Sequence, residues 1–214
     1  MLDSESVEKP VPIEHSFVTM DEVRSMCRTL AELARQRGPI PDLVIGIANG
    51  GTLPAYLVAE ALGRPLKLVF VQHKGSAIKQ RLRPLVDFFH IPPAWILNPL
   101  VRPLWALFQR RTSGLVENTS SFDFSVDGKD VLLVDDCVES GKTVTYIKDR
   151  LAGAGAARIA VAVISCVGLD RPDRVAEPEI SLTHIFQFYP WSNNSPHRGA
   201  FLDFMTTHDI QMYR

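Results

Sequence analysis

The sequence predicts an α/β fold, in which an open, mainly parallel β-sheet carries helices on both of its faces. Short apolar runs rich in β-branched residues recur along the chain, as expected of strands buried on both faces of a parallel sheet. Segments with apolar residues at helical spacing alternate with several of these runs. Two of the runs end in a glycine-containing turn that leads directly into a helix, which is typical of strand-to-helix units.

Composition narrows the class of protein. The 214 residues are 46% hydrophobic and 22% charged, which suits one globular domain with a substantial core. The formal net charge of -1 argues against nucleic acid as a partner, because nucleic-acid binding relies on an excess of basic residues. The three cysteines lack metal-ligand spacing, which indicates reduced thiols in a cytoplasmic protein.

The chain is predicted to comprise a lead-in segment over 1–18, a main domain over 19–192 and a C-terminal tail over 193–214. The lead-in is polar and lacks the apolar stretch of a signal peptide. A capping box at Thr19 and Glu22 then predicts a first helix, and Gly38 is expected to end it.

A predicted strand at 43–47 leads into Asn49, Gly50 and Gly51, before a helix over 53–62. Two consecutive glycines remove side chains and expose backbone amides, which suits a bound anion. The alternative is a tight turn in which the glycines serve only to allow a positive φ angle.

The next strand is predicted at 66–71, and an insertion over 73–124 follows it. This insertion is far longer than an ordinary connection between strands. Its middle, residues 88–108, is rich in Trp, Phe and Pro and is flanked by Lys and Arg, and its prolines and Arg102 argue against a membrane span. We expect a subdomain or dimer contact, a lid over a bound molecule, or a peripheral contact with a membrane surface.

The chain is organised around residues 131–144. An apolar strand at 131–134 is followed by Asp135 and Asp136, which we expect to mark its end, because a strand interior would not tolerate two adjacent carboxylates. The carboxyl edge of a parallel sheet is where open α/β folds bind ligands. The two acids there suit a sugar diol or Mg²⁺.

The turn after the acids offers hydroxyl groups, a glycine and the free amides of a helix predicted over 143–151. A helix start binds anions because unpaired N–H donors and the positive end of the helix dipole point at the bound group. We therefore predict a phosphate here, although the spacing is not that of a Walker loop. The alternative is an ordinary strand with a surface Asp pair and Ser140 as a helix N-cap.

Two more strands are predicted, at 158–167 and 179–188. The second leads into Tyr189, Pro190 and Trp191. Aromatic residues at a strand end usually pack in the core, so core packing is one interpretation of this segment.

An apolar strand, two acids and Ser-Gly-x-Thr at 140–143 resemble the signature of the type I phosphoribosyltransferase family, whose members bind 5-phosphoribosyl 1-diphosphate (PRPP). The turn at Gly50 and Gly51 resembles the diphosphate loop of that family, although Asn49 stands where a Lys or Arg is frequent. The motif is most similar to the purine and xanthine-type members. The resemblance implies the type I phosphoribosyltransferase fold, here with a large hydrophobic insertion.

The resemblance also implies roles for the motif residues. Asp135 and Asp136 would hold the ribose hydroxyls and Mg²⁺. The diphosphate would be bound by Asn49, Gly50 and Gly51. The 5-phosphate would be bound by Cys137, Val138, Glu139, Ser140, Gly141, Lys142 and Thr143.

The resemblance also implies which residues act on the base. Purine-type members place an acid at the position of Glu139, where it would act as a general base; a solvated acid at a helix start is the alternative. Tyr189 and Trp191 would stack on the base. No Lys follows Lys148, although purine-salvage relatives use one to read the exocyclic oxygen of the base. Either the acceptor is not a 6-oxopurine, or the base is recognised differently, for example by Arg171 or the insertion.

These expectations predict an enzyme that transfers the 5-phosphoribosyl group from PRPP to a purine-like nitrogenous base, with release of diphosphate. We expect a homodimer that depends on Mg²⁺. One alternative is a regulatory protein that binds PRPP or a nucleotide without catalysis, which Asn49 and the atypical insertion favour. Another is a phosphoribosyltransferase that works at a membrane face on an unusual acceptor.

Overall fold

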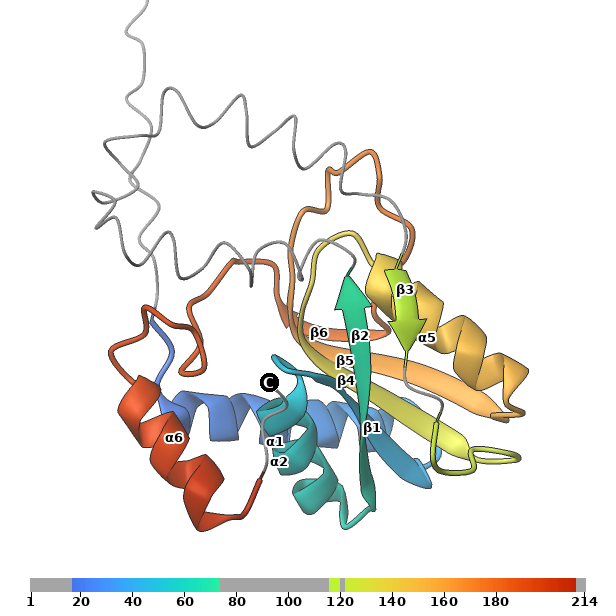
Figure 1. Ribbon diagram of the computed structural model, residues 1–214, viewed down its shortest axis with the longest axis horizontal. Helices are drawn as coiled ribbons and strands as arrows, with labels where there is room; N and C mark the ends of the chain where they lie inside the picture. Colours follow the sequence, from blue (N-terminus) through green and yellow to red (C-terminus); the bar gives the residue numbers. More distant parts are fainter. Residues whose placement is uncertain (1–16, 74–115, 120–121, 211–214) are drawn as a thin grey trace, which may run out of the picture.

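The computed structural model describes residues 17–73, 116–119 and 122–210 (Figure 1). In chain order the elements are α1 (Met20–Gln36), β1 (Leu43–Ala48), α2 (Thr52–Leu62), β2 (Leu66–His73), β3 (Val116–Thr119), β4 (Asp130–Val138), α5 (Lys142–Gly153), β5 (Arg158–Cys166), β6 (Ile180–Thr183) and α6 (Arg198–Thr207). Most of the predicted insertion over 73–124, including 88–108, lies outside the described residues.

The strands form one sheet in the order β3-β2-β1-β4-β5-β6. Strands β2, β1, β4, β5 and β6 run parallel to their neighbours, and only β3 is antiparallel, to β2 at the edge of the sheet. In the middle of the sheet, Gly46 of β1 lies opposite Leu68 of β2 and Val134 of β4. The prediction of an open, mainly parallel sheet is therefore confirmed.

Helices cover both faces of this sheet, as predicted (Figure 1). Leu132 and Val134 of β4 belong to the core that α1, α2 and α6 share, whereas Val131 and Leu133 belong to the core under α5. Alternate residues of one strand thus point to opposite faces and are buried on both, which explains the continuous apolar run in the sequence.

Helix α1 begins where its capping box predicts. The Thr19 hydroxyl accepts a hydrogen bond from the Glu22 amide at 3.3 Å, and the Glu22 carboxylate accepts one from the Thr19 amide at 2.7 Å. Two unpaired donors at the helix start are satisfied in this way. Apolar residues at helical spacing, among them Val23, Cys27 and Leu30, are fully buried against the sheet.

Several element bounds differ from the sequence predictions. Strand β6 ends at Thr183 rather than near 188, because His184 and Ile185 turn back to bond with β5: the His184 ring meets the Cys166 carbonyl and the Ser165 hydroxyl donates to the Ile185 carbonyl. The region predicted as a C-terminal tail contains α6, whose Phe201 is buried in the core. Strand β3 lies within the predicted insertion.

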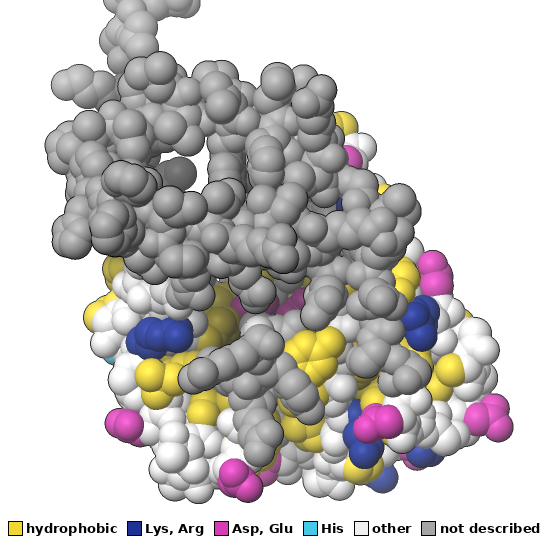
Figure 2. All heavy atoms as spheres, in the orientation of Figure 1, with side chains coloured by type: hydrophobic (Ala, Val, Ile, Leu, Met, Phe, Trp, Pro, Cys, Tyr) yellow, Lys and Arg dark blue, Asp and Glu magenta, His cyan; other side chains and the backbone are white. Residues whose placement is uncertain are grey.

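The visible surface of the described residues mixes both charge signs rather than gathering one of them (Figure 2). This agrees with the nearly neutral formal charge of the chain. Within the described ranges, no helix is both long enough and apolar enough to cross a membrane.

Candidate functional site

The acid pair lies inside β4 rather than after it, which corrects the sequence prediction. Pairing of β4 with β1 stops at Val134, whereas pairing with β5 continues to Val138. Asp135 and Asp136 therefore have a strand neighbour on one side only. A strand can hold two carboxylates here because its other edge has become free at the carboxyl end of β1.

The turn between β1 and α2 packs directly against the acid pair. A Cβ atom added to Gly50 would lie 2.4 Å from Oδ2 of Asp136, and one added to Gly51 would lie 2.7 Å from the carbonyl oxygen of Val134. Neither glycine has a positive φ angle, so the alternative of a turn that needs glycine for its φ is wrong. The glycines are required because the two motifs approach too closely for a side chain.

The turn between β4 and α5 uses its glycine differently. Gly141 has a φ of 78° and is the N-cap of α5, and no side chain caps the helix. The part of the alternative that makes Ser140 the N-cap is therefore wrong. No side chain of the described residues caps the amides of the first helical turn, so these amides can bind an anion.

A hollow of about 240 Å³ lies at this helix start. Its lining consists of Asp135, Cys137, Val138, Glu139, Ser140, Gly141, Lys142, Thr143 and Val144. Every residue predicted to bind the 5-phosphate thus lines one hollow. Burial raises the pKa of the Cys137 thiol to about 12, so this side chain stays neutral at the site.

The raised pKa values of Asp135 and Asp136 indicate that this pair suits a bound cation or hydroxyl donors. Burial raises the pKa of Asp135 well above its ordinary value, and the adjacent carboxylate of Asp136 raises it further. Burial also raises the pKa of Asp136, although the Trp191 indole and backbone N–H groups oppose the rise. Among the described residues, no Lys, Arg or His is a cause of either shift, so the pair lacks a neighbouring cation that would favour its charged form.

Glu139 takes part in a chain of ion pairs that the sequence analysis missed. Arg171 donates to the carboxylate of Glu139 through Nη1 and to that of Asp173 through Nε at 2.9 Å. Asp173 also accepts from Nζ of Lys142 at 2.7 Å. The loop after β5 is thereby joined to both ends of the turn between β4 and α5. The only hint in the sequence is the Arg-Pro-Asp-Arg run at 171–174.

Arg174 fastens the same loop to the backbone of the site. Its side chain is only 8% exposed and donates to the carbonyl oxygens of Glu139, Val167 and Gly168. The amide of Val175 donates to the Ser140 carbonyl at 2.8 Å. The turn that is predicted to bind phosphate is therefore held from outside by backbone and guanidinium hydrogen bonds.

The aromatic residues predicted to stack on a base, Tyr189 and Trp191, meet the acid pair at Asp136. Tyr189 is 4% exposed, and its hydroxyl is 2.5 Å from that of Ser165. The rings of Tyr189 and Trp191 stack on each other with centroids 4.7 Å apart. Trp191 also donates from Nε1 to Oδ2 of Asp136 at 2.7 Å. Their stacking on a base stays a prediction.

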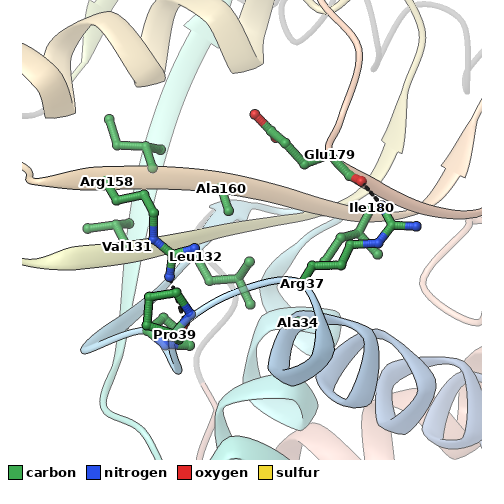
Figure 3. Close-up of a pocket in the computed structure, with 11 residues that line it drawn as sticks. Ala34, Arg37, Pro39, Val131, Leu132, Arg158, Ala160, Glu179 and Ile180 are labelled. Atoms are coloured by element: carbon green, nitrogen blue, oxygen red, sulfur yellow. Dashed lines mark hydrogen bonds between the residues drawn. The ribbon is translucent and has the colours of Figure 1, made fainter.

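A second hollow, of about 250 Å³, lies at the opposite edge of the sheet (Figure 3). The amino ends of β4, β5 and β6 line it. Its two guanidinium groups are engaged by backbone carbonyls, Arg37 with that of Glu179 and Arg158 with that of Pro39. Because its floor is apolar and its cations are occupied, it offers no counterpart to the acids and free amides of the first hollow.

Comparison with known proteins identifies the family. A family model described as a phosphoribosyl transferase domain matches residues 20–198. An amidophosphoribosyltransferase of Staphylococcus epidermidis is 28% identical over 133 residues, 62% of this chain, but the chain covers only 22% of that protein.

Solved structures agree in fold. A purine phosphoribosyltransferase from Pyrococcus horikoshii has a TM-score of 0.58 at 22% identity, and the match covers 84% of this chain and 95% of that one. A hypothetical protein from Neisseria gonorrhoeae with bound ppGpp has a TM-score of 0.57 at 16% identity, covering 91% and 98%. The family match spans the sheet and both glycine turns, so the chain belongs to the phosphoribosyltransferase domain family.

Proposed function

We propose that the protein transfers the 5-phosphoribosyl group of PRPP to a nitrogenous base and releases diphosphate. The observation that carries this proposal is the contact between the Gly50 backbone and the Asp136 side chain. It joins a turn suited to diphosphate, an acid pair suited to ribose hydroxyls and a helix start suited to phosphate at one edge of the sheet. PRPP carries these three groups in one molecule.

In this proposal the 5-phosphate binds over the start of α5. Lys142 points its ammonium group at Asp173, so backbone amides and the hydroxyls of Ser140 and Thr143 would do most of the binding. Asp135 and Asp136 would accept hydrogen bonds from the ribose hydroxyls. The turn at 49–51 would hold the diphosphate through its amides.

The acid pair also fits Mg²⁺. Magnesium prefers carboxylate oxygens and usually completes its shell with water and substrate phosphate oxygens. In the described part of the chain, no group of three or more His, Cys, Asp or Glu is arranged so that it could hold a metal ion by itself. Asp135 and Asp136 would therefore hold the ion together with oxygens of PRPP. When bound, the ion supplies charge neutralisation on the diphosphate.

The proposed reaction is a displacement at the anomeric carbon. A nitrogen of the acceptor forms a bond to C1 of the ribose, and the bond from C1 to the diphosphate oxygen breaks with both electrons leaving on that oxygen. Backbone amides at 49–51 stabilise the departing charge. The proton of the attacking nitrogen passes to the carboxylate of Glu139, whose side chain is 62% exposed and can accept it once its contact with Arg171 loosens.

A purine-like acceptor is part of the proposal. One observation supports it: the guanidinium of Arg171 lies beside Glu139, where it is placed to read an exocyclic oxygen in place of the absent Lys. The names of the relatives mention both a purine and an amido acceptor. Ammonia therefore belongs in any acceptor test.

The experiment is a panel assay. Purified protein is incubated with PRPP, Mg²⁺ and, in turn, hypoxanthine, guanine, xanthine, adenine, orotate or ammonia, and diphosphate release is measured. Release that depends on one acceptor supports the proposal. Tight PRPP binding without release on any acceptor would instead favour a regulatory protein. Absence of PRPP binding would refute the proposed site.

Two further parts of the proposal concern the state of the protein. The described cysteines, Cys27, Cys137 and Cys166, are free thiols, which supports a cytoplasmic location. A homodimer is expected from the sequence analysis, and sedimentation velocity measures it. Sedimentation with liposomes, with and without residues 88–108, tests the alternative of a membrane-face enzyme.

A further inference from the structure

Trp191 makes an unusual contact for a residue expected to stack on a base. Its Nε1 donates to Oδ2 of Asp136 at 2.7 Å, although the two residues are 55 positions apart. Indole has a single N–H donor and no acceptor. The bond to Asp136 therefore uses the only donor of the Trp191 indole, and this bond fixes the orientation of one carboxylate oxygen.

The indole ring is itself held in place from several directions. It stacks on Tyr189 with an interplanar angle of 10°, and its centroid lies 6.1 Å from that of Phe201. The Trp191 carbonyl accepts a hydrogen bond from Arg198 at 2.7 Å. Tyr189 is anchored in turn through its hydroxyl to Ser165 of β5. Moving the indole over a ligand would break its contacts with Asp136 of β4, Tyr189 and Phe201 of α6.

Asp136 is confined from its other side by the turn between β1 and α2. A Cβ atom on Gly50 would lie 2.4 Å from Oδ2 and 2.6 Å from Oδ1 of this carboxylate. The carboxylate therefore lies between a backbone that approaches it closely and an indole that donates to it. Both neighbours act on the same group, and together they determine where its oxygens point.

We propose that Trp191 is a positioning residue for Asp136, which aims the carboxylate at the sugar hydroxyls of the phosphoribosyl donor. This inference rests on the proposed function, and it assigns Trp191 to the sugar half of the site rather than to the base. Its effect should appear in the affinity for PRPP, because a carboxylate that is already oriented loses less entropy when it binds a hydroxyl group.

The decisive variant is Trp191→Phe, which keeps an aromatic ring on Tyr189 and removes the donor. We expect the dissociation constant of PRPP with Mg²⁺, measured by calorimetry, to rise about tenfold, the usual size of a lost hydrogen bond to a charged group. With PRPP saturating, the KM for the base should be unchanged. Trp191→Leu should weaken PRPP binding by the same factor and also leave that KM unchanged. A base-stacking role predicts the opposite: unchanged PRPP affinity and a KM for the base that rises in Leu and recovers in Phe.

The matched control is Tyr56→Phe. It removes a hydroxyl from an aromatic residue of the same core, one that packs on Phe204 and His208, so PRPP affinity should stay within about twofold. If Tyr56→Phe and Trp191→Phe weaken PRPP binding equally, the effect is one of general packing and the positioning role is refuted.

A spectroscopic measurement tests the contact without relying on activity. The sequence has three tryptophans, and the indole N–H signal of Trp191 in an ¹H–¹⁵N spectrum is the one lost in Trp191→Phe, or in Trp191→Leu if Phe does not fold. Asp136→Asn should shift that signal, because a charged acceptor is replaced by a neutral one. An unmoved signal would refute the hydrogen bond.

The two levels of inference can fail separately. If the wild-type protein does not bind PRPP, the proposed function fails, whatever the spectrum shows. If it binds PRPP and Trp191→Phe binds equally well, only the positioning role fails.

Discussion

The two strand-to-helix turns of the site look alike in sequence but differ in how they use glycine. In the turn after β1, Gly50 and Gly51 have ordinary φ angles and leave space for the acid pair of the neighbouring strand. In the turn after β4, Gly141 has a positive φ and presents the amides of a helix start. The first turn requires glycine because the neighbouring strand approaches closely, and the second requires it because of its own backbone conformation.

The turns also differ in charge. The turn after β1 carries Asn49 and two glycines, whereas the turn after β4 carries Glu139 and Lys142, which Arg171 and Asp173 link in a chain of ion pairs. The comparison teaches that the first turn has no charged side chain and can serve only through backbone amides and the neutral amide of Asn49. Proton transfer and charge regulation must come from the second.

Glu139→Gln should have the largest effect on the charge difference between the two turns. It removes their one acid and keeps an oxygen that can accept a hydrogen bond from Arg171. If Glu139 is the general base, the rate of diphosphate release should fall about 10²- to 10⁴-fold, and PRPP affinity should change by less than about threefold. Steady-state kinetics and calorimetry measure the two quantities.

The control for this variant is Glu177→Gln. Glu177 is an exposed acid in the neighbouring loop and pairs with Arg174 at 3.4 Å, so its loss changes charge without touching the proposed base. Equal rates in Glu139→Gln and the wild-type protein would remove the catalytic role and leave the solvated acid as the correct interpretation.

Gly50→Ala tests whether the first turn depends on close approach. The new Cβ would lie 2.4 Å from Asp136, so either the turn or the carboxylate must move. A displacement of about 1 Å at a positioned group costs on the order of 100-fold in rate, and we expect a loss of that size in diphosphate release.

Gly153→Ala is the matched control, since a Cβ there meets no atom within 4 Å and the residue ends helix α5. It should keep full activity and gain up to about 1 kcal/mol of stability, because alanine favours a helix over glycine. Full activity in Gly50→Ala would show that the contact between the motifs is dispensable.

Gly141→Ala tests the second turn, where both conformation and space require glycine. Its φ is 78°, and a Cβ would lie 2.5 Å from the carbonyl oxygen of Ala176. We expect a loss of about 2–3 kcal/mol in the free energy of unfolding, measured by urea titration.

Gly128→Ala separates the two causes, because Gly128 has a φ of 67° and open space around its Cβ position. It should lose only the conformational part, about 1–2 kcal/mol. Identical losses in the two variants would mean that the contact between the turn after β4 and the loop after β5 contributes nothing to stability.

The sequence predicts the buried strands and the helix starts well, because burial on both faces and capping chemistry leave local patterns. It misjudges β4, since the tolerance for Asp135 and Asp136 inside a strand depends on where β1 ends. It misjudges β6, since the alternating pattern continues beyond the point where bonds to β5 turn the chain. It misses α6 because a short helix without a capping motif leaves little local signal.

The site residues likewise divide into those that the sequence predicts and those that it misses. The residues of both turns are contiguous in the sequence, so a motif can reveal them. The partners Arg171, Asp173 and Trp191 come from segments 31 or more positions away from the groups of the two motifs that they bind, and no local pattern tells which acid a given cation or indole will meet. Long-range pairing is set by the packing of the sheet and its loops.

The smallest expected effect comes from Asp173→Asn, which removes the acid that Arg171 and Lys142 share. Hydrogen bonds from Arg171 first, and then from Lys142, hold the pKa of this carboxyl well below its usual range. A group whose pKa is lowered on folding stabilises the protein above its unfolded pKa, near 4, and loses that contribution as the pH falls through the lower folded value.

The Tm of the wild-type protein should therefore exceed that of Asp173→Asn by no more than about 2 °C above pH 5, because exposed ion pairs contribute little. The difference should shrink as the pH falls below 4, and also at 1 M salt, where such pairs are screened. Asp170→Asn, an exposed acid of the same loop, controls for net charge. A Tm difference that persists unchanged at low pH would mean that Asp173 acts through packing rather than through its charge.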